Sequence, residues 1–322
     1  MRDVTGQAKG PLVPVIDLAG SADDVASAIG DACERVGFFQ IVNHGVSDAI
    51  VDGGWAATRT FFEEPDTVRA SVQMPHAGYP YGYQSFAIET LSSSLDNATP
   101  APPDRKHTYS FGPIAATVGD EPSDPDEVWV RSPNLWPDSP TGFRVALEAY
   151  YVEMGALAAR LLGLMARSLS LPASYFTPMI DRHVSALRCL DYPEMREPPA
   201  SAQMRASAHT DYGTLTILRT APGSTGLQAL TADDVWTPID AVAGGFVVNI
   251  GDSLAQWTND RWRSTMHRVV EPPTADRRTS IAFFHNANWD AVIQCLPGLE
   301  PALHPPVRAG RHLINKFHRT VI

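Results

Sequence analysis

The chain has 322 residues, 44% of them hydrophobic, which is enough for one large domain or two with a substantial core. Its formal net charge of −11, without a Lys/Arg run, argues against binding to nucleic acid or to an anionic membrane surface and favours small-molecule chemistry. The three widely spaced cysteines predict reduced thiols, and the lack of an apolar leader or spanning segment predicts a cytoplasmic protein.

The first half of the chain mixes short strands with helices. Residues 13–18 predict a strand, and residues 21–37 predict an amphipathic helix with an N-terminal cap at Ser21. A buried strand at 38–42 and a second helix at about 47–62 follow. Residues 76–95 are rich in Gly, Pro and Tyr without periodicity, which is typical of a loop that carries recognition.

The second half predicts one long helix and then strands. Apolar positions step by three or four from 141 to 171, where Pro172 ends the helix, so this helix should support a β core. The strands after it are short and separated by turns, which favours an antiparallel all-β core over a doubly wound sheet. They are expected at 184–190, from His209 to 218, 226–230, 235–239, 246–250, 261–270 and 279–285. Residues 310–321 could form a final helix over the mouth of this core.

A histidine and an acid stand two places apart in the second of these strands. His209 and Asp211 would share one face of the strand, because side chains alternate along it. With 36 acids and ten His in the chain, about one such pair is expected by chance. His267, 56 residues after Asp211, could bring a second imidazole to the same point. Two His and one carboxylate on one face of a metal, with open positions opposite, are the ligands of non-haem Fe(II) oxygenases, although Zn(II), Mn(II) or Co(II) would also accept them.

A second polar pair follows 11 residues after His267. Arg278 and Ser280 share a strand face by the same alternation. A guanidinium fork and a hydroxyl within an apolar strand suit one carboxylate of a small acid.

Taken together, the His-x-Asp pair, the distal His followed by Arg-Val, and Arg-x-Ser resemble the iron(II)- and 2-oxoglutarate-dependent dioxygenases of the isopenicillin N synthase-like family. The resemblance extends over nearly the whole chain. It is carried also by residues 13–18, 37–45, 104–112 and 187–193.

The resemblance implies a fold, a set of cofactors and residue roles. The expected fold is mainly β, a double-stranded β-helix or jelly-roll core packed on the long helix. One integrated unit would comprise an N-terminal region (1–115), a connection with the long helix (116–182), the Fe(II)/2-oxoglutarate core (183–290) and a C-terminal tail (291–322). His209, Asp211 and His267 would bind Fe(II), leaving sites for 2-oxoglutarate and O2. The cosubstrate's distal carboxylate would be bound by Arg278, Ser280 and Tyr192, although Leu190 stands where the family often has an Asn.

These roles predict an oxidoreductase that hydroxylates or desaturates a C–H bond of a small organic molecule and releases succinate and CO2, with secondary metabolism as its expected setting. The candidate substrate contacts are Tyr79 and Tyr83 in the Tyr-rich loop, and Phe283 and His285 after Arg278. Two alternatives stay open. One is an iron oxidase of this fold that does not use 2-oxoglutarate, and the other is a non-catalytic, metal-containing jelly-roll binding protein. The sequence predicts neither the substrate nor the oligomeric state.

Overall fold

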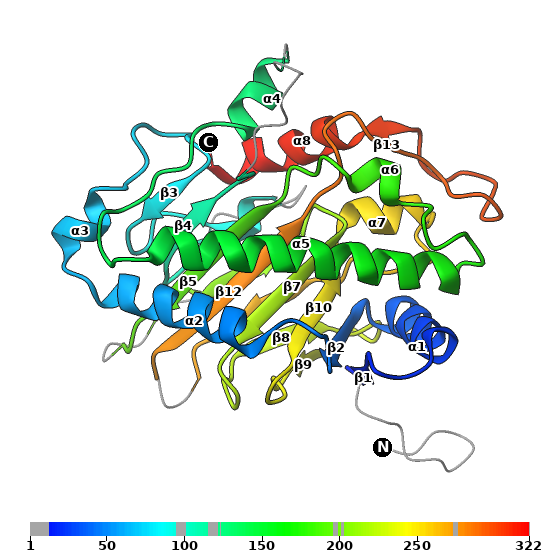
Figure 1. The fold of residues 1–322 in the computed structure, drawn as a ribbon, viewed down its shortest axis with the longest axis horizontal. Coiled ribbons are helices and arrows are strands. Elements are labelled where there is room, and N and C mark those ends of the chain that lie inside the picture. Colours follow the sequence, from blue (N-terminus) through cyan, green and yellow to red (C-terminus); the bar gives the residue numbers. More distant parts are fainter. Residues whose placement is uncertain are drawn as a thin grey trace.

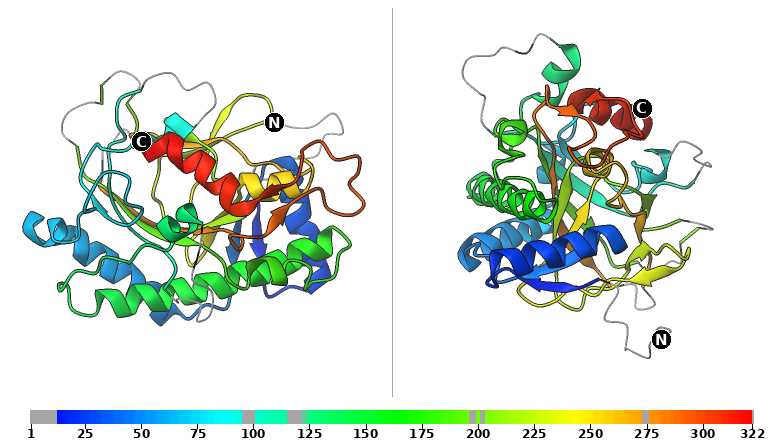
Figure 2. Two further views of the ribbon diagram at one scale, coloured as in Figure 1. Left: turned by 90° about the horizontal axis from the view of Figure 1, so that it is seen from above. Right: turned by 90° about the vertical axis from the view of Figure 1, so that its right-hand side faces the viewer.

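Two main β-sheets, a two-stranded sheet and a layer of helices make up the described part of the molecule (Figure 1). The computed structural model describes residues 13–94, 101–114, 122, 124–195, 199–200, 203–272 and 276–321. The helices α1 (Ala22–Arg35), α2 (Asp48–Glu63) and α5 (Phe143–Ser168) lie side by side on one face of the larger sheet (Figure 2). The predicted helices and the mainly β core packed on a long helix are confirmed, while the four-part division of the chain stays a prediction.

The larger sheet has eight strands and the smaller has four. The larger has the order β1-β2-β10-β7-β12-β5-β4-β3 and the smaller β6-β11-β8-β9. The strands of the larger sheet are β1 (Val15–Asp17), β2 (Phe38–Val42), β3 (Gly82–Gln84), β4 (His107–Phe111), β5 (Ala186–Tyr192), β7 (Leu215–Thr220), β10 (Phe246–Ile250) and β12 (Arg278–His285). Those of the smaller sheet are β6 (Ala206–His209), β8 (Leu227–Leu230), β9 (Trp236–Pro238) and β11 (His267–Val269).

Alternation along the strands of the larger sheet separates two apolar cores. On β12, Ile281 and Phe283 belong to the core under the helices, and Ala282 belongs to the core between the two sheets. On β10, Val248 and Val247 divide in the same way. The side chains that can reach a site between the sheets are therefore those on the face opposite α5.

Two of the predicted strands are wrong in extent. The strand expected to run from His209 to residue 218 ends at His209, and the chain turns before β7 begins in the other sheet. Gly213 packs so closely in this turn that a Cβ there would lie 2.3 Å from the carbonyl oxygen of His285. Of the strand expected at 261–270, only β11 forms, and α7 (Asp252–Trp257) stands between it and β10.

The N-terminal strands are part of the same sheet as the core. β1 pairs with β2 in parallel, and β2 pairs with β10 antiparallel, so the larger sheet is mixed. Its far edge is made by β4, which pairs with β5, and by β3. The antiparallel prediction therefore holds for the second half of the chain and not for the β1–β2 edge.

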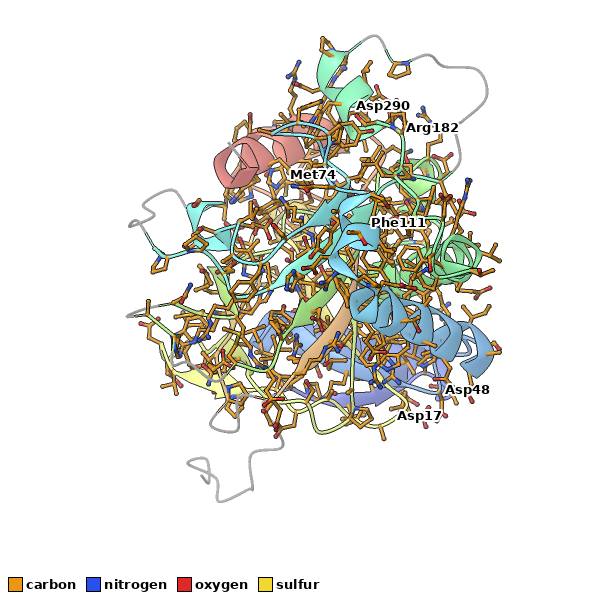
Figure 3. All side chains as sticks on the ribbon, turned by 90° about the vertical axis from the view of Figure 1, so that its left-hand side faces the viewer. Asp17, Asp48, Met74, Phe111, Arg182 and Asp290 are labelled. Atoms are coloured by element: carbon orange, nitrogen blue, oxygen red, sulfur yellow. The ribbon has the colours of Figure 1, made fainter. Side chains whose placement is uncertain are left out.

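The expected final helix is present as α8 (Ala309–Val321), which packs near the 3₁₀ turn at Leu91–Ser94. The remaining short elements are α3 (Asp66–Ala70), α4 (Pro125–Val130), α6 (Thr177–Ile180), β13 (Val292–Ile293) and β14 (Val307–Arg308). After α6, Arg182 pairs with Asp290 at 3.0 Å on the outside of the molecule, whereas Phe111 of β4 lies in its interior (Figure 3). Within the described ranges, even the 26-residue α5 lacks an apolar run that could cross a membrane.

Candidate metal centre and its cavity

The structure brings His209, Asp211 and His267 together between the two sheets. One potential ligand atom from each residue lies within 4.8 Å of the other two. The Oδ1 of Asp211 is 3.9 Å from Nε2 of His209 and 3.8 Å from Nε2 of His267. β6 and β11 are neighbours in the smaller sheet, and His209 is paired with His267 across them. Strand pairing therefore positions both imidazoles.

The ring orientations leave one nitrogen of each imidazole facing the carboxylate. Nδ1 of His209 lies 2.7 Å from the carbonyl oxygen of Ser207, and Nδ1 of His267 lies 3.1 Å from that of Thr265. A carbonyl can only accept, so Nδ1 carries the proton in both rings and Nε2 has a free lone pair. This is the usual second contact of a histidine that ligates a metal.

Asp211 reaches the two imidazoles from the turn after β6, and not by alternation along a strand as the sequence predicted. The turn is held by backbone contacts with the start of α7, where Asp252 N–H donates to the carbonyl of Asp211 at 2.8 Å. Gly251 allows this close approach, because a Cβ there would lie 2.2 Å from the carbonyl oxygen of Gly213. The carboxylate is fixed by hydrogen bonds to Oδ2 from Thr216 at 2.6 Å and Asn249 at 2.7 Å. Its Oδ1 is the oxygen that faces the imidazoles.

Burial and neighbouring charge set the protonation of this group. Burial and the nearby His267 lower the pKa of His209 to about 4. Burial alone would raise the pKa of Asp211, but His267, His209 and the two hydrogen bonds to Oδ2 hold it below its usual value. A neutral imidazole and an ionised carboxylate are the forms that bind a divalent metal.

The guanidinium of Arg278, on β12 of the larger sheet, lies on the wall of the same cavity as the three potential metal ligands. Arg278 is 5% exposed, and its Nη1 donates to Ser280 Oγ at 3.1 Å. Its guanidinium carbon lies 4.9 Å from the centre of the Tyr192 ring, and Tyr192 is its cross-strand partner. Burial lowers the pKa of Arg278, although arginine stays charged at any ordinary pH. Within the described part of the chain, its Nε is buried without a hydrogen-bond partner.

One cavity of about 150 Å³ joins these two sets of residues. Its wall includes His209, Asp211 and His267 together with Arg278, Ser280 and Tyr192. The other lining residues include Phe38, Tyr81, Glu89, Leu91, Ser110, Arg188, Tyr212, Asn249, Phe284, Asn286, Leu313 and Phe317.

The four predicted substrate contacts lie elsewhere. The hydroxyl of Tyr79 donates to the carbonyl of Pro133 at 2.6 Å, and that of Tyr83 lies 2.8 Å from His107 Nδ1. Phe283 and His285 project from the β12 face opposite the cavity. Phe283 packs edge-on against Tyr151 of α5, with the ring centres 5.1 Å apart. None of the four is among the lining residues of the cavity in the described part of the chain.

Sequence reasoning missed several residues that line the cavity. Strand alternation could have predicted Phe284, because it lies an even number of residues after Arg278 and Ser280 and so on the same face of the strand. Arg188 likewise has the parity of Tyr192 on β5. Glu89 stands in the loop that was expected to carry recognition, but nothing in its immediate sequence distinguishes it. Asn249 had no local signal, since its contact with Asp211 joins residues 38 positions apart.

Comparisons with known proteins agree with this geometry. Residues 13–139 match the family described as non-haem dioxygenase in morphine synthesis N-terminal, and residues 182–287 match the 2OG-Fe(II) oxygenase superfamily. The 2-oxoglutarate-dependent dioxygenase caaD of Aspergillus niger is 31% identical over 286 residues, covering 85% of this chain and 84% of that protein. The chain belongs to the Fe(II)- and 2-oxoglutarate-dependent oxygenases. The predicted family is thereby confirmed.

Other proteins are similar to this oxygenase over most of their length. Proline hydroxylase buaE of Petromyces alliaceus is 34% identical over 279 residues, which are 83% of each chain. The crystal structure of a full-length Neurospora crassa protein in complex with alpha-KG has a TM-score of 0.82 at 28% identity and covers 95% of both chains. The structure of the same Neurospora protein with alpha-KG and thymine has a TM-score of 0.80 at 27% identity and covers 95% of this chain and 96% of that one.

The oxygenase uses Fe(II), 2-oxoglutarate and O2, and the residues present fit these groups. Two imidazoles and a carboxylate form the ligand set expected for Fe(II) with open positions. The unpartnered Nε of Arg278 is a buried donor suited to an anion.

Proposed function

We propose that this oxygenase hydroxylates or desaturates a C–H bond of a small organic molecule held in the cavity between the sheets. The observation that carries the proposal is the convergence of His209, Asp211 and His267 within 4.8 Å on the wall of that cavity. The reaction would couple substrate oxidation to decarboxylation of 2-oxoglutarate, with succinate and CO2 as co-products.

The three convergent residues would hold the iron through Nε2 of the two imidazoles and Oδ1 of Asp211. The carbonyls of Ser207 and Thr265 hold the rings in the required tautomer, and Thr216 and Asn249 hold the carboxylate. When bound, Fe(II) supplies the oxidising chemistry with O2 and 2-oxoglutarate, for which the amino acids themselves have no suitable group. The Phe38 ring packs edge-on against His267, with the ring centres 5.4 Å apart, and would help to exclude water from the His267 side of the metal site.

Arg278, Ser280 and Tyr192 would bind the distal carboxylate of 2-oxoglutarate. The buried guanidinium gives this end of the cavity a positive charge, and Ser280 fixes the direction of its Nη1. The Tyr192 ring faces the same guanidinium. The alpha-KG in the crystal structure of the Neurospora protein supports an anion site in this family.

A small-molecule substrate is supported by the cavity and by the similar proteins. One is named a proline hydroxylase, and one structure of the Neurospora protein contains thymine. A cytoplasmic location and a role in secondary metabolism stay predictions from the sequence.

The direct test is substrate-stimulated release of succinate by the iron-loaded enzyme. A compound library should contain molecules that raise succinate release above the rate without substrate, with an equal amount of oxidised product. Turnover of a true substrate without succinate would favour the 2-oxoglutarate-independent oxidase, and 2-oxoglutarate binding without any turnover would favour the binding protein.

The ligand assignment has its own test. His209→Ala should remove stoichiometric Fe(II) binding while the protein stays folded, because the remaining two ligands hold the ion weakly. His304→Ala is the matched control, since His304 is a surface residue paired with Asp260. Retained stoichiometric iron in His209→Ala would refute the assignment.

A further inference from the structure

A second charged cluster reaches the cavity wall through Arg188 of β5 and Glu89, with Lys106 and Asp104 behind them. Nη1 of Arg188 donates to both carboxylate oxygens of Glu89, at 2.9 and 3.0 Å. Nζ of Lys106 lies 3.1 Å from Glu89 and 2.9 Å from Asp104. The exposed fractions of these side chains are 13% for Arg188, 6% for Glu89, 1% for Lys106 and 0% for Asp104. Two cations and two anions thus form a buried group without net charge.

Arg188 is paired with Ala282 of β12, four residues from Arg278. Tyr192, in contrast, lies within electrostatic range of both Arg188 and Lys106. On β5, Arg188 and Tyr192 are four residues apart on one face, which is about 13 Å along a strand. Thr216, which holds Asp211, is on β7, and β12 lies between β7 and β5. Arg188 is level with Leu218 of β7, two residues from Thr216. Arg188 and Thr216 are therefore separated by roughly 10 Å across the sheet and by about 7 Å along it. The cavity that lies between is lined by Glu89, Arg188 and the three proposed metal ligands.

The salt bridge leaves hydrogen-bonding capacity on both partners. Arg188 uses Nη1 for Glu89 and Nε for Ser110 Oγ at 3.1 Å. Its Nη2 makes no hydrogen bond to any described residue, and it is not among the fully enclosed unpartnered atoms. Each oxygen of Glu89 can accept more than one hydrogen bond. The wall therefore presents a donor beside an acceptor.

The charge balance decides which ligands suit this pair. A carboxylate brought to Arg188 would meet Glu89 at the same guanidinium, so repulsion would offset the attraction while the cost of dehydrating the anion stayed. A neutral group with a carbonyl beside an N–H can satisfy both partners at a much smaller dehydration cost. The nearby lining residues Leu91, Phe284 and Leu313 would contact an apolar frame.

We infer that the substrate of this oxygenase is a neutral molecule with an amide, lactam or imide group, whose carbonyl accepts from Arg188 and whose N–H donates to Glu89. This inference rests on the proposed function, because it names the substrate class of the same cavity. Arg188 and Glu89 would fix one end of the substrate and so select which C–H bond lies near the iron.

Binding of matched probes tests the inference without turnover. The enzyme loaded with Fe(II) and 2-oxoglutarate, without oxygen, is titrated by calorimetry with cyclohexanecarboxamide, cyclohexanecarboxylate, 2-piperidone and pipecolate. The amide should bind about tenfold or more tightly than the carboxylate, and the lactam more tightly than the zwitterionic pipecolate. Tighter binding of either charged probe, or no measurable binding of both neutral probes at millimolar concentration, would overturn the inference.

A charge change in the wall sharpens the test. Glu89→Gln leaves the cluster with a net positive charge, so its preference for the amide over the carboxylate should fall by about tenfold or reverse. Glu153→Gln, on α5 beyond the opposite face of the sheet, is the control and should keep the wild-type ratio. An unchanged ratio in a folded Glu89→Gln would contradict the inference. If Glu89→Gln does not fold, the wild-type comparison of the four probes decides alone.

The same titrations keep the two proposals apart. If 2-oxoglutarate fails to bind the iron-loaded wild-type enzyme, the proposed function fails. If 2-oxoglutarate binds and the probes show the opposite preference, only the substrate class is wrong.

Discussion

Asn249 and Asp211 are joined by a hydrogen bond of 2.7 Å from the Asn249 amide to Oδ2 of the carboxylate. Asn249 is on β10 in the larger sheet, whereas Asp211 lies in the turn after β6 of the smaller sheet. The bond therefore ties the proposed metal ligand to the scaffold from the opposite sheet. Because Asp211 is outside any strand, its direction depends on this bond and on the one from Thr216.

Asn249→Ala should weaken Fe(II) binding by about 10–100-fold, because one of the two bonds that orient the carboxylate is lost. The measurement is iron titration of the metal-free protein, with thermal unfolding to show that the fold persists. Asn315→Ala, at an exposed position on α8, is the control. An Asn249→Ala protein with wild-type iron affinity would mean that the hydrogen bond from Thr216 alone is sufficient to orient the Asp211 carboxylate.

The sequence could predict features that depend on local patterns. The cap at Ser21, the length of α5 and the shared face of Arg278 and Ser280 follow from helix and strand periodicity, and the structure has each of them. Applied one step further along β12, the same alternation would have selected Phe284 and excluded Phe283 and His285 as cavity residues. The sequence prediction chose Phe283 and His285 because they follow Arg278 closely, and it did not apply the alternation to them.

Other features depend on contacts between distant residues. The turn that carries Asp211 looks like a continuous strand in sequence, because Thr and aliphatic residues alternate directly after it. The chain changes sheets there, and the close packing of Gly213 and Gly251 against other backbone accompanies this change. The salt bridge of Arg188 with Glu89 joins residues 99 positions apart, and a single sequence holds no signal for that pairing.

Two adjacent arginines allow a matched test of cosubstrate binding. Arg278→Lys should raise the KM for 2-oxoglutarate by roughly tenfold or more, because lysine loses the planar fork that binds a carboxylate through two hydrogen bonds. Arg277→Lys should change it less than about twofold. Arg277 is 37% exposed and donates to Asp191 at 2.7 Å, away from the cavity. Equal effects of the two substitutions would argue against Arg278 as the carboxylate site.

His107 should make the fold sensitive to acid. Burial and the nearby Arg69 lower the pKa of His107 from 6.5 to about 4, and its Nδ1 lies 2.8 Å from the hydroxyl of Tyr83. Between pH 6.5 and about 4 the unfolded chain binds more protons at His107 than the folded one. The contribution of the neutral His107 to the free energy of unfolding is therefore complete above pH 6.5 and is lost as the pH falls towards about 4.

The measurement for His107 is the free energy of unfolding by urea at about pH 7 and about pH 4.5. His107→Gln should lose less stability between these conditions than the wild type, whatever its stability at neutral pH. His76→Gln, at an exposed position in the same half of the chain, should behave as the wild type. An equal loss in His107→Gln and wild type would show that other groups cause the acid sensitivity.

Adjacent phenylalanines on β12 separate packing from substrate contact. Phe283 is fully buried under the helices and contacts Tyr151, whereas Phe284 lines the cavity. Phe283→Leu should lower the free energy of unfolding by roughly 1–2 kcal/mol, through lost contacts in a close-packed core, and leave the substrate KM nearly unchanged. Phe284→Leu should raise the KM of the substrate found by succinate release, by about threefold or more, at a smaller cost in stability. Urea unfolding and steady-state kinetics on both variants measure the two effects, and a raised KM in Phe283→Leu alone would place the substrate on the other face of the sheet.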